Sequence, residues 1–142
     1  CEIDIKGNKT IILKPQTYMN LSGESVQPLA AFYKITPQEI LVIQDELDLP
    51  FGQCHFKMGG GLAGHNGLKS IAACLGTEDF ARMRVGIGRP VHGSVSDWVL
   101  SRFSKDDQIK MDLLFEKLHG PLEDCVLSGI PKASLVNKKP LI

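Results

Sequence analysis

Short apolar stretches bounded by turn residues alternate along the chain with stretches of helical periodicity. Residues 1–5 alternate apolar and polar side chains, residues 6–9 are turn formers, and residues 10–13 are β-branched or apolar, a pattern that predicts a β-hairpin. The apolar run 40–43 predicts a strand buried on both faces, as in a parallel sheet. Residues 53–58 and 83–88 predict two further strands. Because strands and helices interleave, the pattern predicts an α/β protein with a mixed sheet.

The first predicted helix begins near Asn20 or Ser22, either of which can act as its N-cap. Its apolar face consists of Val26, Leu29, Ala30 and Tyr33. Pro28 is expected in a first turn or at a kink. Residues 36–39 combine a capping threonine, a proline and a glutamate, which predicts one short helical turn. A second helix is predicted over residues 68–75.

Ser104 is the predicted N-cap of a long helix. The apolar stripe of this helix comprises Ile109, Leu113, Leu114, Leu118, Leu122 and Val126. Pro121, preceded by Gly120, is expected to kink or break the helix, and Gly129 to end it. Residues 94–103, which contain the only tryptophan, predict a mixed strand or turn.

Length and composition place the chain among ordinary globular proteins. Its 142 residues predict a single domain spanning 1–142, and a content of 43% hydrophobic and 23% charged residues excludes disordered, collagen-like and coiled-coil chains. No apolar run approaches the roughly 20 residues of a membrane span. Sixteen basic residues balance sixteen acidic ones, which argues against indiscriminate nucleic-acid binding but leaves room for a local basic patch.

The four cysteines form no Cys-x-x-Cys pair, so neither a zinc site nor a disulfide scaffold is predicted. Reduced, mostly buried thiols and the absence of a signal peptide together predict a cytoplasmic protein. Asp45, Glu46 and Asp48 follow the apolar run, but their spacing matches no EF-hand, and a solvated surface is the preferred interpretation over a metal site.

Five glycines lie within residues 59–67, between a predicted strand and a predicted helix. Such a cluster favours special backbone conformations or a close approach to a ligand, and free N–H groups there can receive a phosphate or a carbonyl oxygen. A flexible connection is the alternative. A dinucleotide fingerprint matches formally at Gly59, Gly61 and Gly64, but the preceding strand is charged where that motif requires an apolar one. Next to the glycines, His65 and Asn66 are candidates for positioning an ester carbonyl or a water, with a structural histidine as the alternative.

Four segments in order resemble the bacterial-type peptidyl-tRNA hydrolase family: residues 14–23 (KPQTYMNLSG), 40–50 (ILVIQDELDLP), 59–69 (GGGLAGHNGLK) and 82–90 (RMRVGIGRP). The resemblance covers nearly the whole chain. It departs at Leu62 and Ala63, where relatives often carry histidine and glycine. It implies a three-layer αβα sandwich with a mixed, mostly parallel central sheet, from which the family's first strand is absent here.

The family's reaction is hydrolysis of the ester that joins a peptide to tRNA, which recycles tRNA from stalled translation. By resemblance, Asp45 is catalytic, because it would hydrogen-bond the base histidine and fix its tautomer. Asn20 would bind the substrate end and orient water or the carbonyl. Tyr18 and Met19 would form the pocket wall.

The same resemblance implies that Asn66, with His65 beside it, binds the peptide or the terminal nucleotide. Lys57 and Arg84 match positions that grip the phosphate of the tRNA acceptor stem. Asn20, Asp45 and Asn66 are therefore expected to converge. No metal or organic cofactor and no membrane are implied. The implied partner is peptidyl-tRNA, contacted through its acceptor stem and peptide, and the full-length family member is expected to be a monomer.

The family opens with a strand and an arginine-histidine-asparagine segment that carries the general base, and neither is among these 142 residues. The chain is therefore expected to be truncated at its N-terminus, inactive as a hydrolase by itself, and poorly stable because an apolar strand lacks a partner. The alternative interpretation is a non-catalytic RNA- or protein-binding module on the same fold.

Overall fold

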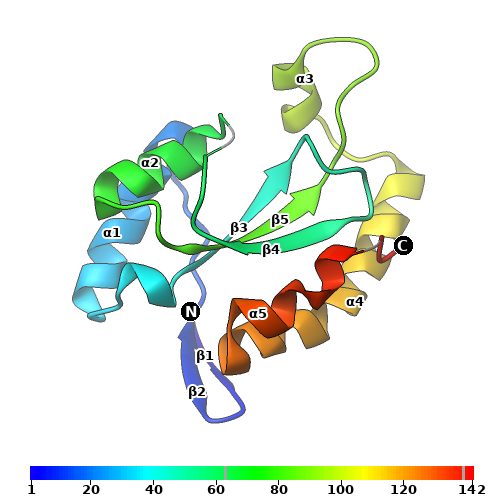
Figure 1. Cartoon of the computed structure of the whole chain (residues 1–142). Helices are drawn as coiled ribbons and strands as arrows, with labels where there is room; N and C mark the ends of the chain where they lie inside the picture. The colour runs from blue at the N-terminus through cyan, green and yellow to red at the C-terminus, as the bar shows by residue number, and fades with distance from the viewer. Residues whose placement is uncertain (63, 139) are drawn as a thin grey trace. The chain divides into compact units, whose positions relative to one another are not determined.

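The computed structural model describes residues 1–62, 64–138 and 140–142 (Figure 1). Ala63, part of the predicted departure from the family pattern, therefore lies outside the described residues. The chain divides into two compact units: unit 1 comprises Cys1–Val42 and Met58–Ala81, and unit 2 comprises Ile43–Lys57 and Arg82–Ile142.

Unit 1 begins with the predicted hairpin. Strands β1 (Glu2–Ile5) and β2 (Asn8–Ile11) pair antiparallel, with Glu2 opposite Ile11. Lys6 and Gly7 both have positive φ angles, 50° and 88°, which is the backbone of a tight turn matched to the twist of two strands. The hairpin is tied to the residue that ends the first helix, because the Tyr33 hydroxyl donates a hydrogen bond of 2.9 Å to Glu2 Oε1.

The helices of unit 1 are α1 (Ser22–Phe32) and α2 (Asn66–Leu75), accompanied by the 3-10 turns η1 (Met19–Leu21) and η2 (Pro37–Glu39). Leu68, Ile71 and Ala72 of α2 form a buried cluster with Phe80. Partly buried hydrophobic residues pack against this cluster: Val26, Ile40, Val42, Leu62 and Leu75. The apolar face of α2 therefore organises the core of this unit.

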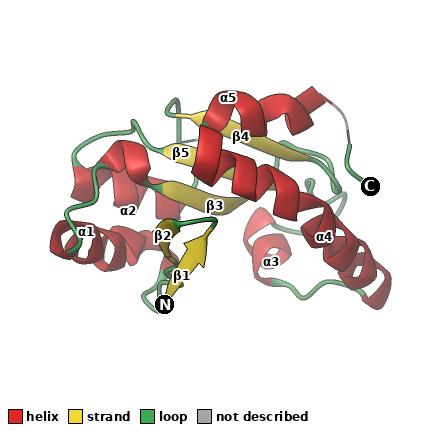
Figure 2. Cartoon of the chain, turned by 90° about the horizontal axis from the view of Figure 1, so that it is seen from below, coloured by secondary structure: helices red, strands yellow, loops and turns green. Residues whose placement is uncertain are grey.

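The central sheet is mixed, as predicted. It contains β3 (Leu41–Glu46), β4 (Cys54–Met58) and β5 (Ala81–Gly86) in the order β3-β5-β4. Backbone hydrogen bonds join Ala81 to Ile40 and Ile87 to Glu46, so the bonded residue numbers differ by the same amount and β3 and β5 run parallel. Backbone hydrogen bonds also join Gly59 to Phe80 and Gly86 to Gln53. The bonded residue numbers here have the same sum, so β4 runs antiparallel to β5. Together with the helices, this confirms the α/β class (Figure 2).

Unit 2 continues with α3 (Val95–Leu100), α4 (Lys105–Ser128), α5 (Ile130–Ala133) and η3 (Ser134–Lys138). Met111, Leu114 and Leu118 of α4 are buried at the i, i+3, i+7 spacing of one helix face. The C-terminal segment is tied to the sheet: Asn137 accepts from the Phe56 N–H at 2.7 Å and donates to its carbonyl at 2.8 Å.

Several sequence predictions about the helices are corrected. Leu21, not Asn20 or Ser22, is the N-cap residue of α1, and the Ser22 hydroxyl instead donates to the Met19 carbonyl at 2.7 Å. Pro28 lies inside α1, which continues because packing of its buried face outweighs one lost backbone hydrogen bond. The region around Trp98 is a helix, α3, capped by the Ser94 side chain, rather than a mixed strand or turn.

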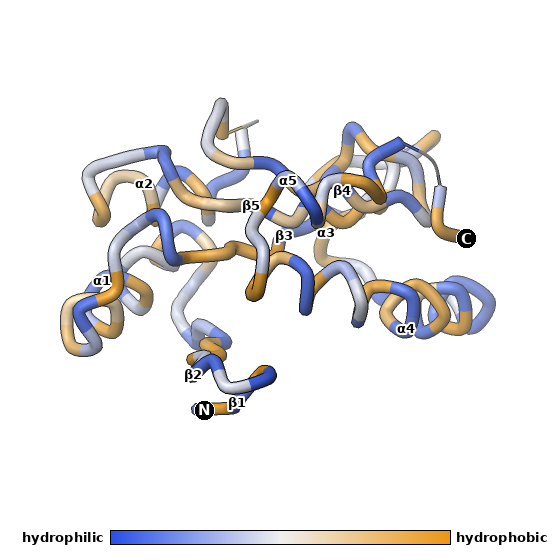
Figure 3. Tube along the Cα trace, turned by 60° about the horizontal axis from the view of Figure 1, so that its bottom comes forward, coloured by the Kyte–Doolittle hydropathy of each residue, from blue (hydrophilic) through white to orange (hydrophobic). Residues whose placement is uncertain are grey.

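The long helix α4 begins after the Ser104 cap as predicted but runs unbroken through Pro121. Gly120 makes this feasible, because the clash of a proline ring with the preceding residue involves a Cβ that glycine lacks. Ile109 and Leu113 of the predicted apolar stripe are exposed, whereas Met111, outside that stripe, is buried. Figure 3 shows the resulting alternation of hydrophobic and hydrophilic residues along α4. The residues after Gly129 form α5 and η3.

The prediction that residues 40–43 are buried on both faces of a strand is wrong. Ile43 is 58% exposed, and the buried side chains of β3 are Gln44 and Glu46. These polar residues lie within the strand rather than after it. The reason is the position of β3, which is an edge strand of the three-stranded sheet among the described residues.

Candidate functional site

The start of helix α2 carries two of the predicted site residues. His65 is the N-cap, and its Nδ1 accepts a hydrogen bond of 3.2 Å from the Leu68 N–H. An accepting Nδ1 uses its lone pair, so the neutral ring carries its proton on Nε2. Neither nitrogen then offers a free lone pair, and this geometry favours a capping role for His65 over that of a general base. Asn66, the first residue of α2, is exposed.

The turn η1 packs against α2 and brings the other predicted residues of this unit to the same place. A Cβ atom on Gly67 would lie 2.7 Å from Met19 Sδ, so the absence of a side chain at Gly67 lets Met19 approach the helix. Asn20 is the middle residue of η1 and is exposed. The segment containing Met19 and Asn20 therefore lies beside the segment containing His65 and Asn66.

Two hydrogen bonds hold η1 and α1 in this position. The Ser22 hydroxyl donates to the Met19 carbonyl, and the Gly23 N–H donates to Ser70 Oγ on α2 at 2.9 Å. Tyr18, the N-cap residue of η1, is 82% exposed. Its ring is therefore free of burial by the rest of the chain and available to pack on a ligand.

The glycine loop adopts the special backbone conformations that its composition predicts. Gly59, Gly60 and Gly64 have φ angles of 64°, 89° and 72°. These angles lie in the left-handed region, which other residues rarely adopt. The loop is thus shaped by its glycines, rather than being a connection that any small residues could make.

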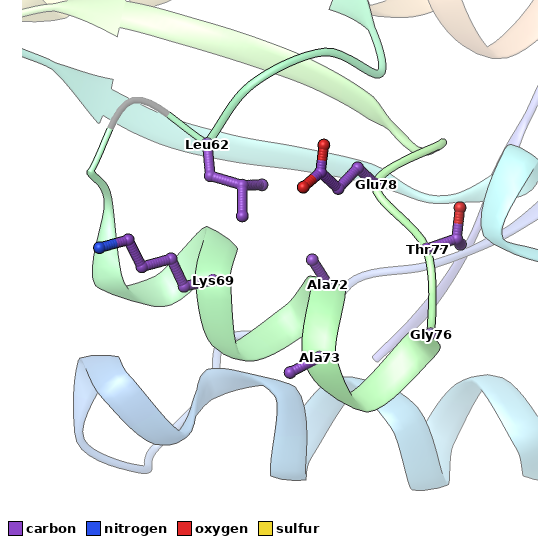
Figure 4. Close-up of a pocket in the computed structure, with 7 residues that line it drawn as sticks. All are labelled: Leu62, Lys69, Ala72, Ala73, Gly76, Thr77 and Glu78. Atoms are coloured by element: carbon purple, nitrogen blue, oxygen red, sulfur yellow. The ribbon is translucent and has the colours of Figure 1, made fainter.

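A hollow of about 350 Å³ lies against α2 and the residues that follow it (Figure 4). It is lined by Leu62, Lys69, Ala72, Ala73, Gly76, Thr77 and Glu78. Its lining includes none of the predicted site residues, so it is separate from the candidate site at the start of the helix.

In unit 2, the strand register brings together the two predicted phosphate ligands. The backbone hydrogen bonds place His55 directly opposite Arg84 and Lys57 directly opposite Arg82 on the β4–β5 pair. Directly opposite residues of an antiparallel pair share a face, so the four side chains form one row, here called the basic face. Lys57 and Arg84 are diagonal neighbours on it, and such neighbours lie about 7–8 Å apart.

Arg84 has a fixed partner that the sequence analysis did not identify. Its Nη1 donates to Glu46 Oε1 at 3.2 Å, and only 26% of the Arg84 side chain and 7% of the Glu46 side chain are exposed. A buried carboxylate requires such a partner, so the pair anchors the guanidinium. The β3–β5 offset places Gln44 directly opposite Arg84 as well. Gln44 Oε1 and Arg84 Nε are both buried without a hydrogen-bond partner in the described part of the chain.

His55 is the second residue that the sequence analysis missed at this site. Burial lowers the pKa of its imidazole, the positive charge of Arg84 lowers it further, and the contributions of Asn137 and Glu46 act in the opposite direction. The signal was present in the sequence: His55 and Lys57 are two apart, as are Arg82 and Arg84, and a strand places residues two apart on one face.

Asp45 lies within β3 and is half-buried. The β3–β5 offset places it opposite Val85, on the face that also carries Cys54 of β4, and thus on the face opposite to the basic one. Asp45 belongs to unit 2, whereas Asn20 and Asn66 belong to unit 1. The expected convergence of these three side chains stays a prediction.

The described residues include no group of three histidine, cysteine or acidic side chains placed to hold a metal ion. Within the same residues, no helix combines the length and apolar character that crossing a membrane demands.

Comparison with known proteins gives a consistent result. Residues 1–140 match the family described as peptidyl-tRNA hydrolase. A peptidyl-tRNA hydrolase of Geotalea uraniireducens (strain Rf4) is 48% identical over 138 residues, which are 96% of this chain and 72% of the relative. One from Nitratidesulfovibrio vulgaris (strain DP4) is 56% identical over 107 residues, 75% of this chain and 53% of the relative.

A solved structure shares the fold. The crystal structure of peptidyl-tRNA hydrolase from Acinetobacter baumannii superposes with a TM-score of 0.88 at 37% sequence identity. The match covers 99% of this chain and 72% of that chain.

Proposed function

Because the chain belongs to the peptidyl-tRNA hydrolase family, we propose that it takes part in hydrolysing the ester bond between a peptide and tRNA. In this reaction a general base removes a proton from water, the water oxygen attacks the ester carbonyl, and the tRNA hydroxyl leaves. The products are a free peptide carboxylate and a reusable tRNA. The observation that carries the proposal is the position of η1 beside the start of α2, which sets Met19 and Asn20 next to His65 and Asn66.

The exposed amides supply the proposed substrate contacts in unit 1. Asn20 and Asn66 each offer an amide donor and an acceptor, which suits the ester carbonyl, the peptide backbone and the terminal nucleotide. A donor aimed at the carbonyl oxygen stabilises the negative charge that develops there during attack. Tyr18 and Met19, both exposed, supply an apolar wall for the substrate. His65 contributes by fixing the start of α2 and hence the position of Asn66.

The basic face supplies the proposed contact with the acceptor phosphate. Lys57 offers a mobile ammonium group and Arg84 an anchored guanidinium, and their diagonal placement leaves room for one phosphate between them. This local concentration of charge provides for tRNA binding in a chain whose formal net charge is zero.

Asp45 is proposed to orient the base histidine of the family, which lies in a segment that is not among these 142 residues. We therefore propose that residues 1–142 alone bind substrate but hydrolyse it slowly. Loss of a general base typically costs about 10²–10⁴-fold in rate, and the amides of Asn20 and Asn66 cannot replace proton removal.

The test is ester cleavage of an N-blocked aminoacyl-tRNA by two proteins: residues 1–142 alone, and the same residues preceded by a family opening segment with its histidine. The longer protein is expected to be faster by about 10²–10⁴-fold. In it, Asn20→Ala, Asp45→Asn and Asn66→Ala should each reduce kcat/KM, whereas Asn8→Ala, an exposed asparagine in the hairpin, serves as the matched control.

Two outcomes contradict parts of this proposal. Equal rates for the two proteins would show that the base lies within residues 1–142. RNA binding without cleavage by the longer protein would favour a non-catalytic binding module on the same fold.

A further inference from the structure

The phosphate contact proposed above involves Lys57 and Arg84, but the register of the sheet adds a third nitrogen-bearing side chain to their row. His55 is directly opposite Arg84 and two residues before Lys57 on the same strand. Directly opposite residues of a hydrogen-bonded antiparallel pair have Cα atoms about 5.5 Å apart. A phosphate held between Lys57 and Arg84 is therefore within reach of the imidazole.

The surroundings of His55 keep it partly accessible. It is half-buried, while its strand neighbours Cys54 and Phe56 are fully buried on the other face. The Asn137 side chain bonds to the backbone of Phe56, whereas the Asn137 backbone hydrogen-bonds the His55 imidazole, which has two ring nitrogens. The fourth member of the row, Arg82, is buried and so contributes charge rather than a direct contact.

We infer that His55 is a third phosphate-contacting residue of the basic face, adding its positive charge to those of Lys57 and Arg84 when the phosphate is bound. The inference rests on the proposed phosphate site. It goes beyond that site because it makes the affinity for the phosphate depend on protonation of the His55 imidazole.

The charged groups around His55 decide the direction of this dependence. Arg84 opposes protonation from the neighbouring strand and Glu46 favours it, while Lys57 and Arg82 add further positive charge along the face. In the free protein, burial and then the charge of Arg84 lower the pKa of His55, against the opposing contributions of Asn137 and Glu46. A phosphate adds negative charge next to the ring and raises the pKa again. Binding therefore takes up a proton, and affinity rises as the pH falls between the two pKa values.

The size of the effect follows from Coulomb's law. A negative charge about 6 Å from the imidazolium, at an effective dielectric constant between about 20 at a protein surface and about 80 in water, strengthens binding by roughly 3- to 100-fold, with about tenfold in the middle of that range. A side chain that stays positively charged at position 55 would give, at every pH, the affinity that the wild-type chain has at low pH.

The experiment measures the dissociation constant of the 142-residue chain for an RNA hairpin with a tRNA acceptor stem and a 5′-phosphate, at pH 5.5 and pH 8 and constant ionic strength. The wild-type chain is expected to bind about tenfold more tightly at pH 5.5, beyond any change shown by His55→Gln. His55→Lys should bind tightly at both pH values. His119→Gln, an exposed histidine on α4, is the matched control and should behave as wild type. Circular dichroism at both pH values verifies folding of each variant.

A second measurement needs no variant at this position. In the wild-type chain, the pKa of His55 followed by NMR should rise when the hairpin is added. The inference is overturned if the hairpin binds but His55→Gln keeps the full pH dependence, or if the pKa of His55 does not rise. If Lys57→Ala and Arg84→Ala leave binding unchanged, or if no binding occurs at either pH, the phosphate site itself is wrong, and the role of His55 falls with it.

Discussion

The contact between α1 and α2 allows a sharp prediction for Gly23→Ala. A Cβ atom at this position would lie 2.3 Å from the Ser70 carbonyl oxygen and 2.7 Å from Cys74 Sγ. The oxygen belongs to the backbone of α2, so it cannot move unless the helix moves. Separating the helices would also weaken the hydrogen bond from the Gly23 N–H to Ser70 Oγ.

Opposing contributions determine whether this substitution raises or lowers the free energy of unfolding. Inserting a methyl group into a packed contact costs about 1–3 kcal/mol, and the weakened hydrogen bond about 1 kcal/mol more. Replacing glycine by alanine inside a helix returns about 1 kcal/mol. The net expectation is a loss of about 2 kcal/mol in the free energy of unfolding, measured by urea denaturation followed by circular dichroism.

The neighbouring Glu24→Ala is the matched control, because Glu24 is exposed on the same helix, and its effect should stay within about 0.5 kcal/mol. Adding Cys74→Ala to Gly23→Ala should restore little, since the closest atom is the backbone oxygen of Ser70. A Gly23→Ala chain as stable as wild type would refute the close approach of the two helices at this point.

Three further outcomes are expected. At pH 8 a thiol reagent should modify the exposed Cys74 and spare Cys54, because burial raises the pKa of the Cys54 thiol to about 12. Equal modification of the two cysteines, measured by peptide mass mapping, would contradict this. Hydrogen bonds from the Thr36 N–H and hydroxyl lower the pKa of Glu39, so the capping box of η2 persists at neutral pH and is lost as the pH falls through that lowered pKa. NMR should show a higher Glu39 pKa in Thr36→Val, and no change would count against the bond. The chain is expected to self-associate along the outer border of β3, which has no strand beside it in the described residues, and Ile43→Lys, which places a charge at an exposed position of that strand, should reduce this association in sedimentation velocity; unchanged association would exclude this strand as the contact.

Local signals in the sequence predicted local structure well. The hairpin, the capping box at Thr36 and the Ser104 cap each depend on residues within a few positions of one another. The predictions that failed depend on distant parts of the chain. Whether Ile43 is buried is decided by what lies beside β3, and whether α1 tolerates Pro28 is decided by its packing on other residues.

The same division applies to the candidate site. The family resemblance implied that Lys57 and Arg84 both contact the acceptor phosphate, and the register places them on one face. It did not predict the pairing of Arg84 with Glu46, because that contact depends on the order of strands β3 and β5, which no local pattern encodes. The prediction for Asp45 combines a resemblance with a position in a strand, and ester hydrolysis by its variant is the direct test of it.

The side chain of Asn137 has a consequence for how molecules can assemble. By bonding to both backbone groups of Phe56, its amide occupies the outer border of β4 as a neighbouring strand would. In the described portion of the chain, the outer border of β4 is therefore occupied at Phe56, whereas β3 has no strand beside its outer border. A second molecule could add its own β3 along that border. When two molecules pair along their β3 strands, the outer border of β3 is occupied in both of them. Association by this route therefore stops at a closed dimer and cannot continue into a fibre.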